Sequence, residues 1–225
     1  MDNDTGNKNN ITYPPETGAC YSHGWRILWT YFLDLLLILV VSILISIPSG
    51  GLGTGDEMNN IFSFYIFMVS LVYTVLVQWP VEMGIAYTFL KAVRNEKPQV
   101  TDIISVFKNY LNAVLAGVLV SFIIVVGLFL LIVPGIIFAC KLAFVPYLIV
   151  EEKLDAVAAI QKSWNMTTGH AFTIFLIGVL AIFIALAGLI ALIVGIFIAI
   201  IWIRLAMAAL YHSVSQLEST PVQPV

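Results

Sequence analysis

Residues 117–134 read GVLVSFIIVVGLFLLIVP, and residues 178–195 read GVLAIFIALAGLIALIVG. Aligned without a gap, the two stretches are identical at about 10 of 18 positions, and Gly127 falls in register with Gly188. Each copy lies inside an apolar run of roughly 40 residues, although one membrane crossing needs only about 20. Each run is therefore expected to cross a membrane, turn and cross back. The repeated stretch predicts a multi-pass membrane protein built from helical hairpins.

The overall composition points the same way. The chain has 225 residues, of which 60% are hydrophobic and 10% are charged, and its mean hydropathy is +1.00. Soluble domains are typically about 25% charged, and a water-soluble fold this poor in charge would expose apolar patches that aggregate. The net charge of −3 gives no sign of a nucleic-acid partner, because nucleic-acid binders carry a clustered basic face. We therefore expect lipid to be the solvent of this protein.

The alternation of polar and apolar segments gives the domain organisation. Residues 1–23 are expected to form a disordered polar tail, residues 24–214 a transmembrane domain, and residues 215–225 a polar C-terminal tail. Six spans are expected, at about 25–48, 61–93, 109–132, 135–150, 171–187 and 190–213. The sequence thus predicts an all-α polytopic transmembrane helical bundle, with six spans as three pseudo-repeated hairpins and with cytoplasmic interfacial helices.

Proline and glycine mark interruptions of these spans. Pro80 lies inside the second span and predicts a kink. The sequence Val133-Pro134-Gly135 is expected to form a type II turn between the third and fourth spans, because Pro and Gly suit its two central positions. The polar segment 151–170 places Leu154, Val157 and Trp164 toward one side, which predicts a helix on the membrane surface.

Four ionisable residues lie within the expected spans, and they are Asp34, Glu82, Lys141 and Arg204. Charged side chains are costly in lipid and usually face protein or a cavity. Counted from the polar segments at about 1.5 Å per residue, all four lie roughly 12–15 Å below the cytoplasmic boundary. Two acids and two bases at one depth can neutralise one another. We therefore expect Glu82 to pair with Lys141 or Arg204, and Asp34 to balance the remaining base.

This intramembrane charge layer has two interpretations. It is either a salt-bridge layer that fixes how the hairpins associate, or a polar pathway that binds a substrate. The balanced charge favours the structural role, and no chain of Asp, Glu or His continues to the far side, as a proton relay requires. No catalytic, cofactor or metal site is expected, because the sequence has no P-loop, no GxSxG motif and no metal-ligand spacing among its three histidines.

Basic residues predict the orientation of the spans. Lys and Arg cluster in the connection between the second and third spans and in the connection between the fourth and fifth. The alternate connections, at residues 49–60 and around residues 134 and 188, contain neither Lys nor Arg. By the positive-inside rule, both termini and the two long connections are expected to be cytoplasmic.

Several short motifs occur within about residues 24–214: Pro98 followed by Asp102-Ile-Ile-Ser-Val-Phe, LLIVPGII with PYLIVEE beyond it, Asp155-Ala156 leading to Ser163-Trp164 and Gly169, and a last hairpin that ends in Ala-Leu-Tyr211. In these motifs the chain resembles the bacterial membrane proteins grouped with the glycerophosphoryl diester phosphodiesterase membrane domain and related uncharacterised multi-pass families. In that family the membrane region can be fused to a soluble phosphodiesterase domain. These 225 residues contain no such segment, so the resemblance implies no active site.

The expected function follows from these features. We expect a non-enzymatic multi-pass protein of the bacterial cytoplasmic (inner) membrane that acts as a scaffold or accessory subunit. The alternative is a small transporter or lipid-handling protein that uses the intramembrane charge layer. A transporter needs a water-accessible cavity that reaches the charges, whereas a scaffold does not. The expected partners are the lipid bilayer and a protein partner or second copy of the chain in the membrane, with no cofactor and no nucleic acid.

Cysteine labelling from outside intact cells tests the expected orientation. A cysteine placed at Asn59 should be labelled, because its connection lacks basic residues and is expected outside. A cysteine placed at Lys97 should not be labelled, because that connection carries a cluster of Lys and Arg. The reverse labelling pattern would contradict the expected topology.

Overall fold

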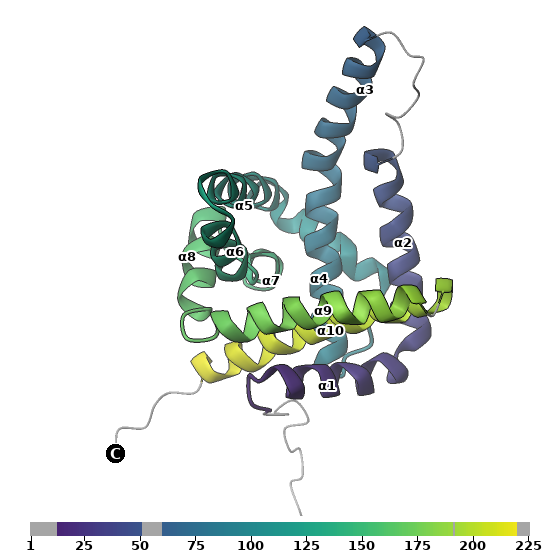
Figure 1. The fold of residues 1–225 in the computed structure, drawn as a ribbon, viewed down its shortest axis with the longest axis vertical. Coiled ribbons are helices and arrows are strands. Elements are labelled where there is room, and N and C mark those ends of the chain that lie inside the picture. The colour runs from purple at the N-terminus through teal and green to yellow at the C-terminus, as the bar shows by residue number, and fades with distance from the viewer. Residues whose placement is uncertain (1–12, 51–59, 191, 220–225) are drawn as a thin grey trace, which may run out of the picture.

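The computed structural model describes residues 13–50, 60–190 and 192–219, and the secondary structure of these residues is entirely helical. Three times in succession, a short helix precedes a long helix and a second, returning helix (Figure 1). The first group contains α1 (Thr17–Thr30), α2 (Phe32–Gly50), α3 (Asn60–Tyr73), the π-helix η1 (Thr74–Gln78) and α4 (Trp79–Val93). The second contains the 3₁₀-helix η2 (Val100–Asn109), α5 (Tyr110–Leu130), α6 (Ile132–Lys141) and α7 (Val145–Glu151). The third contains α8 (Ala156–Met166), α9 (Ala171–Ile190) and α10 (Leu192–Ser219).

The long helices of each group form one hairpin. Hairpin 1 is α2 with the α3–η1–α4 rod, hairpin 2 is α5 with α6 and α7, and hairpin 3 is α9 with α10. Within the described part of the chain, five helical segments are long and apolar enough to cross a membrane. The number rises to six if α1 and α2, which meet at a bend of 97°, count as one broken span. The all-α class is confirmed, and the long apolar helices agree with a membrane protein of five or six spans.

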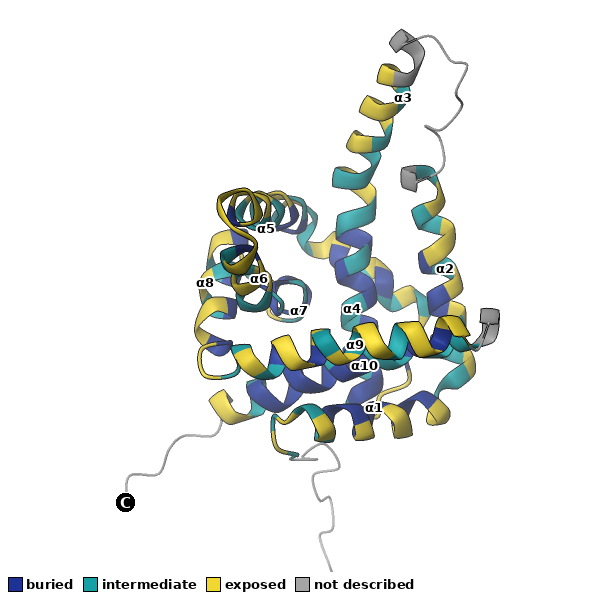
Figure 2. Cartoon of the chain, viewed as in Figure 1, coloured by how far each residue is buried: buried dark blue, intermediate teal, exposed yellow. Residues whose placement is uncertain are grey.

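The three hairpins point in different directions. In Figure 1, α2 and the α3–α4 rod run vertically, α9 and α10 run across them, and α5, α6 and α7 are seen end-on. The hairpins therefore do not lie side by side along their length, as the helices of a parallel bundle would. Away from the centre their surfaces are largely exposed, as the yellow ribbon in Figure 2 shows. Phe129 and Ile190, near the ends of α5 and α9, are 92% and 84% exposed.

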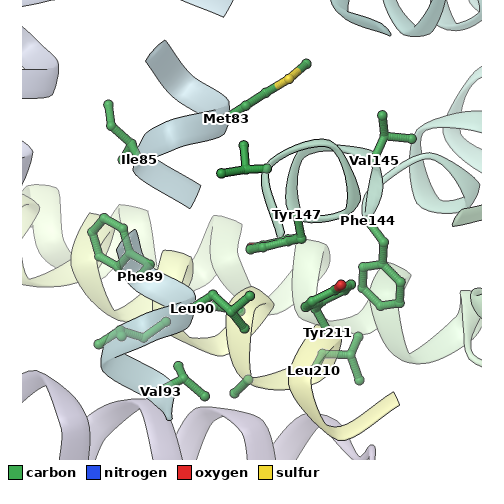
Figure 3. Packing of buried hydrophobic residues seen from close by; sticks show 14 of the residues in the cluster. Met83, Ile85, Phe89, Leu90, Val93, Phe144, Val145, Tyr147, Leu210 and Tyr211 are labelled. Carbon is green, nitrogen blue, oxygen red and sulfur yellow. The ribbon is translucent and has the colours of Figure 1, made fainter. Parts of the chain in front are cut away.

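The core lies where the second helices of the three hairpins converge, and we call this region the junction (Figure 3). It consists of α7 and the C-terminal halves of α4 and α10, which bury most of their apolar side chains. The rings of Tyr147 and Tyr211 stack with their centroids 4.6 Å apart, and Phe144 meets Tyr211 edge-on. Phe89 is 1% exposed, and full burial of such a side chain contributes about 1.5–3 kcal/mol. The junction therefore holds the hairpins together.

Glycines let two of the short helices lie directly on second helices. The helix η2 crosses α4 at Gly84, where an added Cβ would lie 2.2 Å from the carbonyl oxygen of Ile103. The helix α1 crosses α10 at Gly24, where an added Cβ would lie 3.2 Å from the Cβ of Leu205. Any side chain at Gly84 would thus separate η2 from α4.

The third short helix, α8, crosses hairpin 2 at the break between α6 and α7. The Ser163 hydroxyl donates to the carbonyl oxygen of Lys141 at 2.8 Å and accepts from the Phe144 N–H at 3.3 Å. Both backbone groups lie at a helix end, where intrahelical partners are missing. The short helix of the second group thus packs on hairpin 1, that of the third on hairpin 2, and that of the first on hairpin 3. These contacts close a ring around the junction.

The start of the first group differs from the sequence-based prediction. Residues 17–23, expected in the disordered tail, belong to α1, and the expected span 25–48 is divided by the 97° bend after Thr30. The polar residues of this segment make it resemble a disordered tail in sequence, although one face of α1 is apolar and packs on α10. The ring of Trp25 lies 4.8 Å from that of Trp202, between centroids.

The boundary between the helical domain and the C-terminal tail also differs from the prediction. Helix α10 continues to Ser219, so residues 215–219 of the expected polar tail are helical. The predictions for residues 1–12 and 220–225 lie outside the described residues.

The turn between α5 and α6 lies at Leu131 and not at Val133–Gly135. Leu131 has an extended backbone (φ −167°, ψ 147°), and Pro134 and Gly135 lie in the first turn of α6. Proline is tolerated there because the first N–H groups of a helix have no intrahelical acceptor. An added Cβ at Gly135 would lie 2.5 Å from the Leu128 side chain. The glycine therefore serves the close packing of α6 on α5.

The glycines that fall in register in the repeated stretches have comparable surroundings. An added Cβ at Gly127 would lie 3.0 Å from the Cα of Gly135, and one at Gly188 would lie 2.8 Å from the carbonyl oxygen of Gly195. Each glycine thus lets the two helices of its hairpin approach closely. Gly178 is different, because an added Cβ there would meet no atom within 4 Å.

Pro80 disturbs the regular α-helical hydrogen bonding of the hairpin 1 rod, and a π-helix lies just before it. Because proline has no N–H, the carbonyl oxygen of Leu76 loses the donor it would have in a regular helix. The π-helix Thr74–Gln78 lies directly before this point, as is common where a helix must absorb an irregularity. The Tyr110 hydroxyl donates to the Leu76 carbonyl at 2.8 Å. The residue that opens α5 therefore satisfies the acceptor that Pro80 leaves free.

Replacing Gly84 by alanine should lower the thermal stability of the protein in detergent. The new methyl group would press on the Ile103 backbone, and overpacking of this kind costs about 1–3 kcal/mol. Gly178→Ala is the matched control, because its methyl group enters open space and alanine favours a helix by about 0.5–1 kcal/mol. Equal melting temperatures for the two variants would contradict the close approach of η2 to α4.

Candidate functional site

Two of the four intramembrane charges meet in the structure. Glu82 lies in the first turn of α4, and its Oε2 is 2.9 Å from Nη1 of Arg204 on α10. The Ser42 hydroxyl of α2 donates to the other carboxylate oxygen of Glu82 at 3.2 Å. The side chains of Glu82 and Arg204 are 35% and 31% exposed. The ion pair joins hairpin 1 to hairpin 3 and is one of the two pairings expected for Glu82.

The other two charges lie apart from this pair. The Lys141 amino group donates to the Thr168 hydroxyl at 2.8 Å and lies 5.4 Å from the centre of the Trp164 ring. Asp34, in the first turn of α2, is half-buried, and its carboxylate forms no ion pair or hydrogen bond with another described side chain. The expected balance between Asp34 and Lys141 is therefore absent. Lys141 ends α6, and its side chain contacts the end of α8 and the turn that follows it.

A pocket of about 370 Å³ reaches the Glu82–Arg204 pair between hairpins 1 and 2. Apart from the ion pair, most of its lining is apolar, with Met83, Ala86 and Val120 among the lining residues. The volume lies in the range of small-molecule sites, about 300–1,000 Å³. A guanidinium has five N–H donors, so Arg204 retains donors beyond the one that meets Glu82. The pocket can hold a molecule with an apolar body and a hydrogen-bond acceptor.

Two apolar hollows separate hairpins 2 and 3. One, which we call the α6–α9 groove, has a volume of about 390 Å³ and lies between α6 and the first turns of α9. The other has a volume of about 370 Å³ and reaches Met207 of α10. Both are lined by Ile136, Cys140 and Phe175. These hollows result from the divergence of the hairpins away from the junction.

The junction contains a polar cluster that the charge pattern does not reveal. The Arg94 guanidinium at the end of α4 forms an ion pair with Glu151 at the end of α7. The Tyr211 hydroxyl donates to the same carboxylate at 2.8 Å, and Arg94 Nε donates to Nδ1 of His212 at 3.4 Å. Glu151 and Tyr211 belong to the motifs PYLIVEE and Ala-Leu-Tyr, which are the one signal in the sequence for this cluster.

Residues of α1 and of the segment before it cover the outer side of the junction. Arg26 donates to Nδ1 of His23 at 3.1 Å, so His23 is neutral and its Nε2–H donates to the Val93 carbonyl at 3.1 Å. The Tyr13 ring stacks on His23 with 4.7 Å between centroids, and its hydroxyl donates to the Ala209 carbonyl. Burial raises the pKa of Tyr13, so this hydroxyl keeps its proton. These bonds tie α1 to the end of α4 and the segment before α1 to α10.

Comparison with known proteins does not narrow these possibilities. No family model matches the chain, and no curated protein and no solved structure matches it either. The resemblance to the glycerophosphoryl diester phosphodiesterase membrane domain therefore stays a prediction. Among the residues that the structure describes, no group of three or more His, Cys, Asp or Glu side chains could hold a metal ion.

A double-mutant cycle tests the ion pair. Glu82→Gln should leave the Arg204 charge without its partner, at a cost below the roughly 3–5 kcal/mol of a fully buried pair because both groups are partly exposed. Adding Arg204→Met should recover part of that loss, whereas adding Lys141→Met should give a simple sum. The measurement is thermal stability in detergent, and Glu96→Gln, at an exposed acid, is the control. Additive effects for Glu82 and Arg204 would contradict the pairing.

Proposed function

We propose that this chain is a non-enzymatic integral membrane protein that holds a lipid-like molecule in the pocket beside the Glu82–Arg204 pair. The observation that carries the proposal is a pocket of about 370 Å³ that reaches both charges. Its apolar walls suit a hydrocarbon chain, and the spare guanidinium donors of Arg204 suit a polar group at the end of that chain. Lipid handling is thus favoured over the scaffold role.

The choice rests on what each function requires of the charges. A scaffold needs no cavity at Glu82 and Arg204, and its ion pair could be sealed between helices. About one third of each side chain is instead exposed, and both line the pocket. A role as scaffold or accessory subunit is the second candidate. It is favoured by the bonds of Glu82 to Ser42 and Arg204, which link α2, α4 and α10.

We further infer a placement in the bacterial inner membrane with both termini on the cytoplasmic side. The threefold order of short helix, long helix and second helix supports three repeated hairpins. The distribution of Lys and Arg supports the orientation. In this placement the junction and its Arg94–Glu151 pair face the cytoplasm, and the diverging ends of the hairpins lie in lipid.

Filling the pocket tests the proposed function. Native mass spectrometry of the wild-type protein in mild detergent should detect a retained lipid. Ala86→Leu should reduce that retention, because the larger side chain occupies the pocket. The matched control is Ala187→Leu, on an exposed position of α9, which should retain lipid as the wild type does. Unchanged retention in Ala86→Leu would contradict the proposal, and a protein partner lost only from Glu82→Gln would favour the scaffold role.

A further inference from the structure

We propose a second site that binds an anionic phospholipid and is distinct from the pocket beside Glu82 and Arg204, which we call the ion-pair pocket. One acyl chain would occupy the α6–α9 groove, and Lys141 would bind the phosphate. The proposal rests on the placement of the chain in a membrane, but not on the occupancy of the pocket beside Glu82.

The groove offers an apolar surface of suitable shape for one hydrocarbon chain. Its volume is about 390 Å³, and its walls are entirely apolar, with Val133 and Ile137 on α6 and Phe172 and Phe175 on α9 among them. From Val133 to Cys140 the α6 wall extends for about 10 Å, at 1.5 Å per residue. Phe172 is 70% exposed, so a large aromatic ring remains uncovered at the groove.

A cation follows the last groove residue of α6. Lys141 directly follows Cys140 and lies one helical turn after Ile137 of the groove wall. Its amino group donates to Thr168, which lies in the turn before α9 and four residues before Phe172 of the opposite wall. A Lys ammonium has three donors, so donors remain for phosphate oxygens after this bond. The Thr168 hydroxyl itself donates to the Trp164 carbonyl at 2.8 Å, which fixes it as the acceptor from Lys141.

The charge of Lys141 is not compensated by the described part of the protein. Four other cations lie within 4 Å of a carboxylate, and they are Lys91, Arg94, Lys162 and Arg204. No described carboxylate lies that close to Lys141, whose partners are Thr168 and the Trp164 ring. A positive charge beside an apolar groove is complementary to a ligand with an anionic head and a hydrocarbon tail. Trp164 is 39% exposed and belongs to α8, the helix expected on the membrane surface. Because Lys141 contacts Trp164, it lies nearer the membrane–water boundary than the roughly 12–15 Å expected from residue counting.

A free phosphate fits these features less well than a phospholipid. It would use the amino group of Lys141 but leave the groove empty. A zwitterionic lipid would fill the groove but carry no net charge to balance Lys141. An anionic phospholipid uses both.

Lipid titration monitored by native mass spectrometry tests the proposal. The wild type should bind phosphatidylglycerol about tenfold more tightly than phosphatidylcholine of the same chains, because the choline cation of the latter offsets the phosphate charge that Lys141 meets. Lys141→Met should remove this preference. Lys108→Met, at an exposed lysine of η2, removes the same charge elsewhere and should preserve it. A preference that survives Lys141→Met overturns the proposal.

A second variant examines the groove without changing charge. Ala171→Leu narrows the groove and should weaken the binding of both lipids, whereas Ala86→Leu in the ion-pair pocket should leave the preference for phosphatidylglycerol unchanged. Glycerol phosphate, which has no acyl chains, should not compete at concentrations that saturate the lipid. Equal competition by glycerol phosphate, or full binding by Ala171→Leu, would overturn the proposal. Failure of the ion-pair pocket would instead appear as full lipid retention in Ala86→Leu.

Discussion

The structure depends on the junction where α4, α7 and α10 converge. Aromatic side chains fill it, and the Glu151 carboxylate receives both the Arg94 guanidinium and the Tyr211 hydroxyl. In an apolar setting such charges are stable only when they are paired and hydrogen-bonded. Three short helices surround the junction, each on the second helix of another hairpin. The hairpins are thereby fixed at one end, and their other ends remain separate.

This divergence explains where the hollows lie. Near the junction the helices pack tightly, and away from it the hairpins share few contacts, so pockets form between hairpins 1 and 2 and between hairpins 2 and 3. Apolar lining makes these hollows suitable for lipid chains. The Glu82–Arg204 pair lines one of them, and Lys141 directly follows Cys140 in the wall of another. The same arrangement that anchors the hairpins thus creates the proposed binding sites.

The sequence predicts the parts of this fold that depend on local pattern. Apolar length predicts the long helices, and the register of Gly127 with Gly188 predicts matching close contacts within hairpins 2 and 3. The alternatives for Glu82 include its true partner, Arg204. The separation of Lys141 from that pair depends on the break between α6 and α7, which Pro146 in the first turn of α7 marks in the sequence but whose effect on the direction of the Lys141 side chain is set by the packing of α8. The directions of the hairpins depend on tertiary packing at the junction, which spacing along the chain does not encode.

Spin-label distance measurement in lipid nanodiscs tests the divergence of the hairpins most directly. The labels are placed at Phe129 and Ile190, on the exposed ends of α5 and α9, after replacement of Cys20 and Cys140 by alanine. The labelled helices α5 and α9 have 21 and 20 residues and are each about 30 Å long at 1.5 Å per residue, so hairpins fixed only at the junction should hold these labels more than about 25 Å apart. A distance of about 10–15 Å, as between neighbouring helices of a parallel bundle, would contradict this account.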